Sequence, residues 1–415
     1  MSYLQHTASA LLLAGYLSLG NSSIQAQTNT TLGQWGYQLD STQVNELAIE
    51  ADGVAFFKNN EYAGAVMDGY TLPGFWLQLK ATYQPMKNLK LEFGAHSLVY
   101  NGANKYPCYA YQDIATWKGG QYQHGFHVLP YLRAHLQLRS WHLVLGNIYG
   151  GQEHGLIAPM YNPELNLTAD PEAGFQAIYD NRLFHFDAWV NWQSFVFNLD
   201  NHQEAFTVGM SSEVRYNEKS SRVHFYSPIQ FVAQHRGGEI IDDMEDRSVK
   251  TLYNAALGFG TQWNLNRRGV KTVNLEADAL MHFQQTGQLW AKDTGFAGYA
   301  KASALFRYGI YAEAGYFIAK DFNTLLGIPY YGSVSLNNRG RYMDRTQTLF
   351  LSVDYSRTFA KHYALGVKVD TYYYCPKGAY NAEGPVAADN EFGFSVGVFF
   401  RANPRFLIKR FKGKE

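Results

Sequence analysis

Apolar and polar side chains alternate along Val270–Gln284, a stretch far longer than the usual strand of about 5 or 6 residues. A strand sends successive side chains to opposite faces, so one face of this segment is apolar and the other polar. From Thr272 to Gln284 only Leu280 falls out of register, on the polar face. This length and pattern are typical of a tilted strand that crosses a bilayer and projects beyond it.

The same pattern recurs from Glu46 almost to the end of the chain, with no linker or shift in composition between segments. Val270–Gln284 follows a similar arm, Leu252–Leu265, after the short turn Asn266–Gly269. The remaining segments are Glu46–Phe57, Phe75–Tyr83, Leu89–Val99, Val128–Arg139, Trp141–Ile148, Gly174–Tyr179, Phe184–Phe195, Ala205–Tyr216, Val223–Gln234, Phe296–Arg307, Ile310–Ala319, Thr346–Phe359, Tyr363–Tyr374 and Glu391–Arg401.

The connections between these sixteen segments alternate strictly between long and short. Asn266–Gly269 and Ala360–His362 are typical of the short ones, whereas Lys58–Gly74 and Lys320–Arg345 are typical of the long ones. A soluble sandwich has no reason to separate loop lengths in this way, but an outer-membrane barrel has short periplasmic turns and long external loops. The sequence therefore predicts an all-β fold, a transmembrane antiparallel up-and-down β-barrel of about 16 strands.

Composition agrees with a barrel whose outer surface meets lipid. Tyr and Phe number 31 and 27, charged residues are only 17%, and Lys plus Arg equal Asp plus Glu at 35 each. Aromatic residues on the apolar face gather at segment ends, as at Trp263 and Phe283, where membrane proteins carry aromatic girdles. The balanced charge argues against a nucleic-acid partner.

Four regions follow from these patterns. Residues 1–26 read as a signal peptide, with a short apolar core at Ala8–Leu19 and a cleavage site after Ala26. Residues 27–45 form a periplasmic lead-in, 46–402 the outer-membrane barrel, and 403–415 a basic periplasmic tail.

The alternation, the girdles and the final segment E-F-G-F-S-V-G-V-F-F-R resemble outer-membrane porins of Gram-negative bacteria. Tyr-rich segments such as M-Y-N-P-E-L and D-P-E-A-G-F-Q-A-I-Y-D resemble barrels of Bacteroidota. The resemblance implies a cell-outer-membrane channel for passive diffusion of small hydrophilic solutes, surrounded by lipid and assembled as a homotrimer. The alternative is a surface-assembly or binding barrel with a plugged lumen, which handles capsule or exopolysaccharide or docks a secretion partner.

Charged residues on the polar face are the candidate pore lining, since about sixteen strands enclose a lumen wide enough for water. Lys80 and Arg133 on one wall oppose Glu276 and Asp278 on the other, which gives either a transverse field or a mixed polar lining. The full set is Lys80, Arg133, Arg215, Glu276, Asp278, Lys301, Arg307, Glu313, Asp354, Lys368 and Asp370.

The long connection Tyr149–Ala173 is the candidate constriction loop, because its apolar side chains would be poorly placed in water. We expect it to fold into the barrel, as the third loop does in the porins that the chain resembles. A lid over neighbouring loops and a contact with a partner are the alternatives. Its candidate site residues are Glu153, His154, Met160, Tyr161 and Glu164.

No local arrangement of nucleophile and base predicts an enzyme, and no residue spacing predicts a metal or another cofactor. The two cysteines, Cys108 and Cys375, both fall in segments assigned to external loops. They are either a disulfide, as an exported protein allows, or two unpaired thiols.

Overall fold

Long antiparallel strands make up most of the chain. The computed structural model describes residues 37–64, 66–101, 124–194, 203–238, 249–287, 289–338 and 340–412. The strands are β1 (Glu46–Ala63), β2 (Asp68–Met86), β3 (Leu89–Asn101), β4 (His124–Leu138), β5 (Trp141–Asn147), β6 (Ala173–Asp180), β7 (Phe184–Ser194), β8 (Ala205–Arg215), β9 (Val223–Arg236), β10 (Lys250–Asn264), β11 (Val270–Thr286), β12 (Thr294–Phe306), β13 (Ile310–Lys320), β14 (Tyr342–Phe359), β15 (Tyr363–Asn381), β16 (Gly384–Val386), β17 (Glu391–Ala402) and β18 (Arg405–Arg410).

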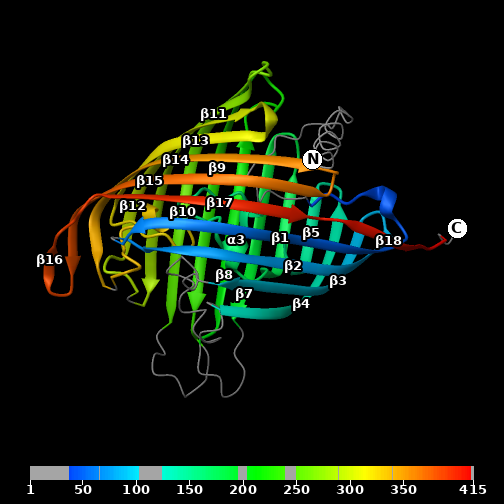
Figure 1. Ribbon diagram of the computed structural model, residues 1–415, viewed down its shortest axis with the longest axis horizontal. Helices are drawn as coiled ribbons and strands as arrows, with labels where there is room; N and C mark the ends of the chain where they lie inside the picture. Colours follow the sequence, from blue (N-terminus) through cyan, green and yellow to red (C-terminus); the bar gives the residue numbers. More distant parts are fainter. Residues whose placement is uncertain are drawn as a thin grey trace, which may run out of the picture.

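The strands close into a barrel (Figure 1). Each of β1 to β15 pairs with its neighbour in sequence, and β17 pairs with both β15 and β1, so sixteen strands form a ring without a free edge. The β16 hairpin lies at one end of the barrel and β18 at the other. The predicted sixteen-strand antiparallel barrel is thereby confirmed, because all sixteen predicted segments fall on β1–β15 and β17.

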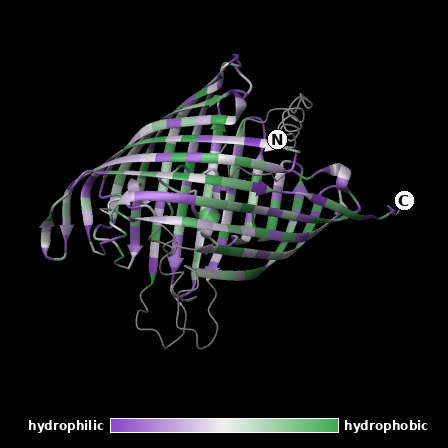
Figure 2. Cartoon of the chain, in the orientation of Figure 1, coloured by the Kyte–Doolittle hydropathy of each residue, from purple (hydrophilic) through white to green (hydrophobic). Residues whose placement is uncertain are grey.

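The two faces of the wall differ in polarity, as the alternating colours along the strands show (Figure 2). On β11, Leu275 and Met281 are 45% and 42% exposed on the outside, whereas Glu276 and Asp278 between them are buried inside. The closed ring pairs the backbone groups of its strands within the sheet, as a bilayer requires. The apolar exterior suits contact with lipid, and the polar interior suits contact with water. Among the described residues, no helix has the length and hydrophobicity needed to cross a membrane.

The structure corrects three details of the sequence reading. The first external connection is not a long loop, because β1 extends to Ala63 and β2 begins at Asp68. Beyond the bilayer a strand needs no apolar face, so alternation stops before the strand ends. The sheet does not end at residue 402: Arg405–Arg410, assigned to the basic tail, forms β18, which pairs with β1 through the register Glu46↔Arg410.

Arg307 is the third correction. It lies in the 3-10 turn η4 (Arg307–Gly309) between β12 and β13, where its side chain is exposed and does not line the lumen. The sequence reading continued the β12 alternation one step too far. The strand ends at Phe306, since Tyr308 and Gly309 adopt positive φ values of 64° and 78° that turn the chain.

Candidate functional site in the barrel lumen

Two connections fold into the barrel and meet inside it. One is the loop 148–172 between β5 and β6, and the other is the loop 321–341 between β13 and β14. Their backbones join in an isolated parallel bridge, Tyr161↔Leu326. The amide of Asn162 donates to the carbonyl oxygen of Leu326 at 2.7 Å, and the amide of Ile328 donates to that of Ala158 at 3.1 Å. We call the described residues of these two loops the plug.

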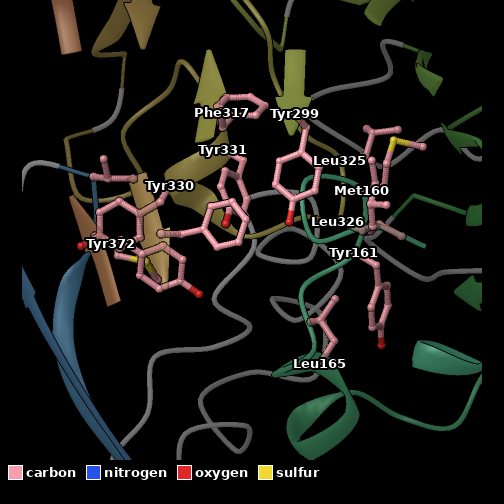
Figure 3. Close-up of a cluster of buried hydrophobic side chains, with 14 of the residues drawn as sticks. Met160, Tyr161, Leu165, Tyr299, Phe317, Leu325, Leu326, Tyr330, Tyr331 and Tyr372 are labelled. Atoms are coloured by element: carbon pink, nitrogen blue, oxygen red, sulfur yellow. The ribbon is translucent and has the colours of Figure 1, made fainter. Parts of the chain in front are cut away.

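Apolar side chains fill the contact between the plug and the wall (Figure 3). Met160, Leu165, Leu325 and Tyr330 are each no more than 1% exposed. Each fully buried side chain of this size contributes about 1.5–3 kcal/mol by leaving water. The wall side chains that face the plug include Leu98, Val232, Leu252, Leu280, Tyr299, Phe317, Phe350, Tyr372 and Tyr374. Leu280, the residue out of register in the sequence, therefore packs against the plug.

Buried polar side chains of the wall hold both loops in place. The Asn254 amide on β10 accepts from the backbone N–H of Leu325 at 2.7 Å and donates to the carbonyl of Asn323 at 2.9 Å. Glu164 in the other loop accepts hydrogen bonds from Lys58 and Tyr70 of β1 and β2. Because a buried carboxylate is costly to leave unpaired, these bonds fix the position of the plug.

His154 anchors the loop 148–172 to β7. Its Nδ1 lies 2.7 Å from the Asp187 carboxylate and its Nε2 lies 3.1 Å from Glu172. Its ring stacks on Trp189 with centroids 3.5 Å apart. Burial lowers the pKa of His154, but Glu172 and Asp187 outweigh it and raise the pKa to about 10. His154 is therefore a cation at neutral pH, with neither nitrogen available to act as a base.

A cavity of about 730 Å³ runs beside the plug along the wall from β1 to β7. Its lining extends from the periplasmic turn at Lys361 and His362 to Gln193 near the external end of β7. Glu153 of the candidate constriction loop lines it, as does Tyr161. The structure thus places all five candidate loop residues inside the barrel, with Glu153 and Tyr161 at the cavity and His154, Met160 and Glu164 fixed in the plug.

Glu92 on β3 brings the basic residues of the cavity together. Its carboxylate lies 2.9 Å from Lys90, 3.3 Å from Arg133 and 3.8 Å from Lys80. Arg133 also donates to the backbone carbonyl oxygens of Asn147 and Ile148 at 2.6 and 2.9 Å, so it links the wall to the start of the loop. Each of these three cations thus has a carboxylate partner within this wall.

The other predicted lining residues lie mostly on the part of the wall formed by β11 to β15. Glu276 of β11 binds Lys301 of β12 at 2.9 Å, and Lys368 binds Asp370 on β15 at 3.1 Å. Glu313 accepts a hydrogen bond from Tyr311, while Asp278 and Asp354 are buried in the same region. Arg215 lies apart near the periplasmic turns, 2.9 Å from Asp180. Local pairing within each wall supports a mixed polar lining rather than a field across the lumen.

The sequence reading missed Glu172, Asp187 and Asn254, which hold the plug in place. Each lies on the polar face or in a loop, where a barrel has many such residues. One sequence feature could have indicated the position of the plug: Leu280 is an apolar side chain on the polar face, and it packs against the plug.

Two expectations lie wholly or partly outside the described residues, the signal peptide of residues 1–26 and the disulfide. Cys375 lies in β15, but Cys108 falls in the segment 102–123, so the disulfide stays a prediction. Within the described ranges, no group of three or more His, Cys, Asp or Glu side chains could hold a metal ion.

The sequence matches the family described as lipid A 3′-O-deacylase-type over residues 39–411. No curated protein matches the chain. Similar solved structures include OmpT of Vibrio cholerae in its trimer form, with 9% identity over 86% of this chain and 99% of that one and a TM-score of 0.46. OccAB3 of Acinetobacter baumannii has 10% identity over 87% and 99% with a TM-score of 0.47. An anion-selective porin from Comamonas acidovorans has 10% identity over 86% and 100%, with a TM-score of 0.44. At these identities the likeness concerns the fold.

Proposed function

The chain belongs to the lipid A 3′-O-deacylase-type family, and we propose that this member is a passive outer-membrane channel for small hydrophilic solutes. The observation that carries the proposal is the polar cavity beside the plug, whose lining reaches from the periplasmic turns to the external end of β7. A closed barrel with an apolar exterior places such a cavity across the bilayer.

The plug sets the width of the proposed path. The two loops pack apolar side chains against much of the wall, including Leu98 of β3, and the polar cavity lies beside them. Solutes therefore pass between the loop 148–172 and the wall, close to Arg133 and Glu153. Pore radius and lining charge are the properties that set selectivity in such a path.

Conductance across a planar lipid bilayer tests the proposal with the purified full-length chain. We expect a small, steady ion current that grows when the loop 321–341 is replaced by a short turn. If the intact chain carries no current and the shortened one does, the passive channel is wrong and the plugged surface-assembly barrel is favoured. No current from either variant also overturns it. The homotrimer stays a prediction, tested by light scattering of the detergent-solubilised protein.

A lipid A deacylase is the second candidate function, because the family description names this activity. A hydrolase of this kind needs a nucleophile with a base in reach. His154 cannot supply that base, since both ring nitrogens face carboxylates, and the Ser211 hydroxyl donates to the backbone carbonyl of His154 instead. Mass spectrometry of lipid A from cells that produce the chain decides the point: loss of the 3′-O-linked acyl chain establishes the enzyme.

A further inference from the structure

Several cations along the cavity already lie next to carboxylates. Lys80, Lys90 and Arg133 share Glu92, and Arg401 of β17 lies 3.7 Å from Asp52. A charged solute that enters must compete with these short contacts and also leave its own hydration shell. The pairing therefore disfavours retention of an ion and leaves the neutral polar groups of the lining to interact with a solute.

Neutral hydrogen-bonding atoms along the same lining lack partners in the described part of the chain. They are the hydroxyl of Tyr131, Oε1 of Gln84 and Nε2 of Gln193. Tyr131 and Gln84 are only 1% and 2% exposed, so these groups are deeply buried in the wall. Together they offer an acceptor at the periplasmic side, a hydroxyl in the middle and a donor near the external end.

An indole ring lies beside these groups. Trp76 lines the cavity from β2, and its Nε1 donates to the backbone carbonyl of Asn166 in the plug at 3.0 Å. This bond fixes the ring against the loop, while His96 lies at a centroid distance of 5.8 Å on the same wall. A fixed aromatic ring offers an apolar face with little loss of conformational entropy on binding.

We propose that the cavity binds neutral, hydroxyl-rich solutes of the carbohydrate class, with Trp76 as the ring platform and Tyr131 as a central hydrogen-bond partner. A sugar hydroxyl both donates and accepts, so a row of hydroxyls matches the mixed donors and acceptors of Tyr131, Gln84 and Gln193. An apolar solute leaves those atoms unpaired, and an anion finds its cations already bound. At about 730 Å³ the cavity lies within the usual size range of ligand pockets. The inference rests on the proposed channel and names its solute class.

Two measurements on the full-length chain test the inference. Maltotriose is the probe, citrate the anionic comparison, and hexaethylene glycol the comparison for a neutral chain without hydroxyl donors along its length. Intrinsic tryptophan fluorescence in detergent reports binding whether or not the barrel conducts, and planar-bilayer current reports occupancy of an open path. We expect maltotriose to give a saturable change in both readouts, and the two comparison solutes to give none.

Conservative variants separate binding from folding. Tyr131→Phe removes one hydroxyl that has no described partner, so folding is unaffected while maltotriose affinity falls several-fold. Trp76→Leu keeps apolar volume but removes the ring, and we expect a loss of ten-fold or more. Trp141→Leu is the matched control, because Trp141 is 41% exposed and outside the cavity lining. Heat-dependent gel migration verifies that each barrel is folded.

The outcomes distinguish this inference from the channel proposal. Ion current without any saturable effect of maltotriose overturns the carbohydrate site and leaves the channel. Saturable fluorescence binding without current supports the site and overturns the channel. Equal losses for Tyr131→Phe and Trp141→Leu overturn the assignment of the site to the cavity, as does equally tight binding of citrate.

Discussion

Glu153 is a lumen residue whose surroundings shift the pKa of its carboxyl into the neutral range. It lies in the short 3-10 helix η3 (Gly151–His154) and lines the cavity. Burial raises the pKa of its carboxyl to about 7, although Arg133 and Arg401 act in the opposite direction and Asp52 adds to the rise. Its charge therefore changes within the neutral range, whereas His154 next to it stays protonated there.

Ion selectivity is expected to depend on pH through Glu153. Below its pKa the carboxyl is neutral, and above it the side chain adds a negative charge to the cavity. The ratio of cation to anion permeability, measured from reversal potentials in a salt gradient, therefore rises from about pH 6 to about pH 8. Glu153→Gln abolishes this rise, while Glu383→Gln, on the exposed external hairpin, retains it. A rise of equal size in Glu153→Gln contradicts the assignment.

His154 is expected to contribute to stability through its two carboxylates. His154→Gln removes the cation between buried Asp187 and half-buried Glu172 and leaves these carboxylates only neutral donors, Gln176 and the Gly151 N–H, at a cost of about 3–5 kcal/mol for a broken buried pair. The temperature at which the barrel loses its folded gel migration should fall. His185→Gln is the control, because His185 forms a longer contact of 3.6 Å with a half-exposed Asp180. Similar unfolding temperatures for the two variants would show that His154 is not an anchor.

At the scale of elements, the strands were predictable and the plug was only partly so. Alternation is a local property, and a strand such as β11 carries it in its own residues. The infolding of the loop 148–172 was predicted from its apolar residues. The loop 321–341 was predicted only as a long external loop, although it supplies Leu325, Leu326 and Tyr330 to the same core. Which wall a loop packs against depends on partners far apart in sequence, such as Asn254 and Leu325.

The plug is expected to loosen when its apolar contact is removed. Leu325→Ala and Leu326→Ala together delete two side chains that are 0% and 5% exposed, and each such change in a core costs about 2–5 kcal/mol. The closed ring of strands does not depend on this contact, so the barrel stays folded while single-channel conductance rises several-fold. Asn338→Ala, an exposed position in the same loop, should conduct like the natural chain. Unchanged conductance in the double variant would mean that these side chains do not hold the plug.

At the scale of the whole molecule, the barrel separates two environments by the parity of its strands. The outward face carries the apolar band, and the inward face carries either charges or, at the level of the plug, apolar side chains such as Leu280. A change of one residue in register exchanges the two faces. Adjacent residues on β11 therefore offer the sharpest test of the complete assignment.

Ala277 and Glu276 are expected to respond oppositely to substitution. Ala277 is exposed on the outer face and pairs with Ala300, so Ala277→Arg places a charge in the lipid at a cost of about 2–4 kcal/mol at midplane. Urea-dependent refolding into lipid vesicles should show this loss. Glu276→Gln keeps one acceptor oxygen for Lys301, and Glu313 remains an acidic neighbour of that lysine, so refolding is impaired less than in Ala277→Arg, while the loss of one inward negative charge shifts permeability toward anions. If both variants refold equally well, or if Glu276→Gln is the one that fails, the assignment of inner and outer faces is wrong, because only a lipid-facing position makes a charge this costly.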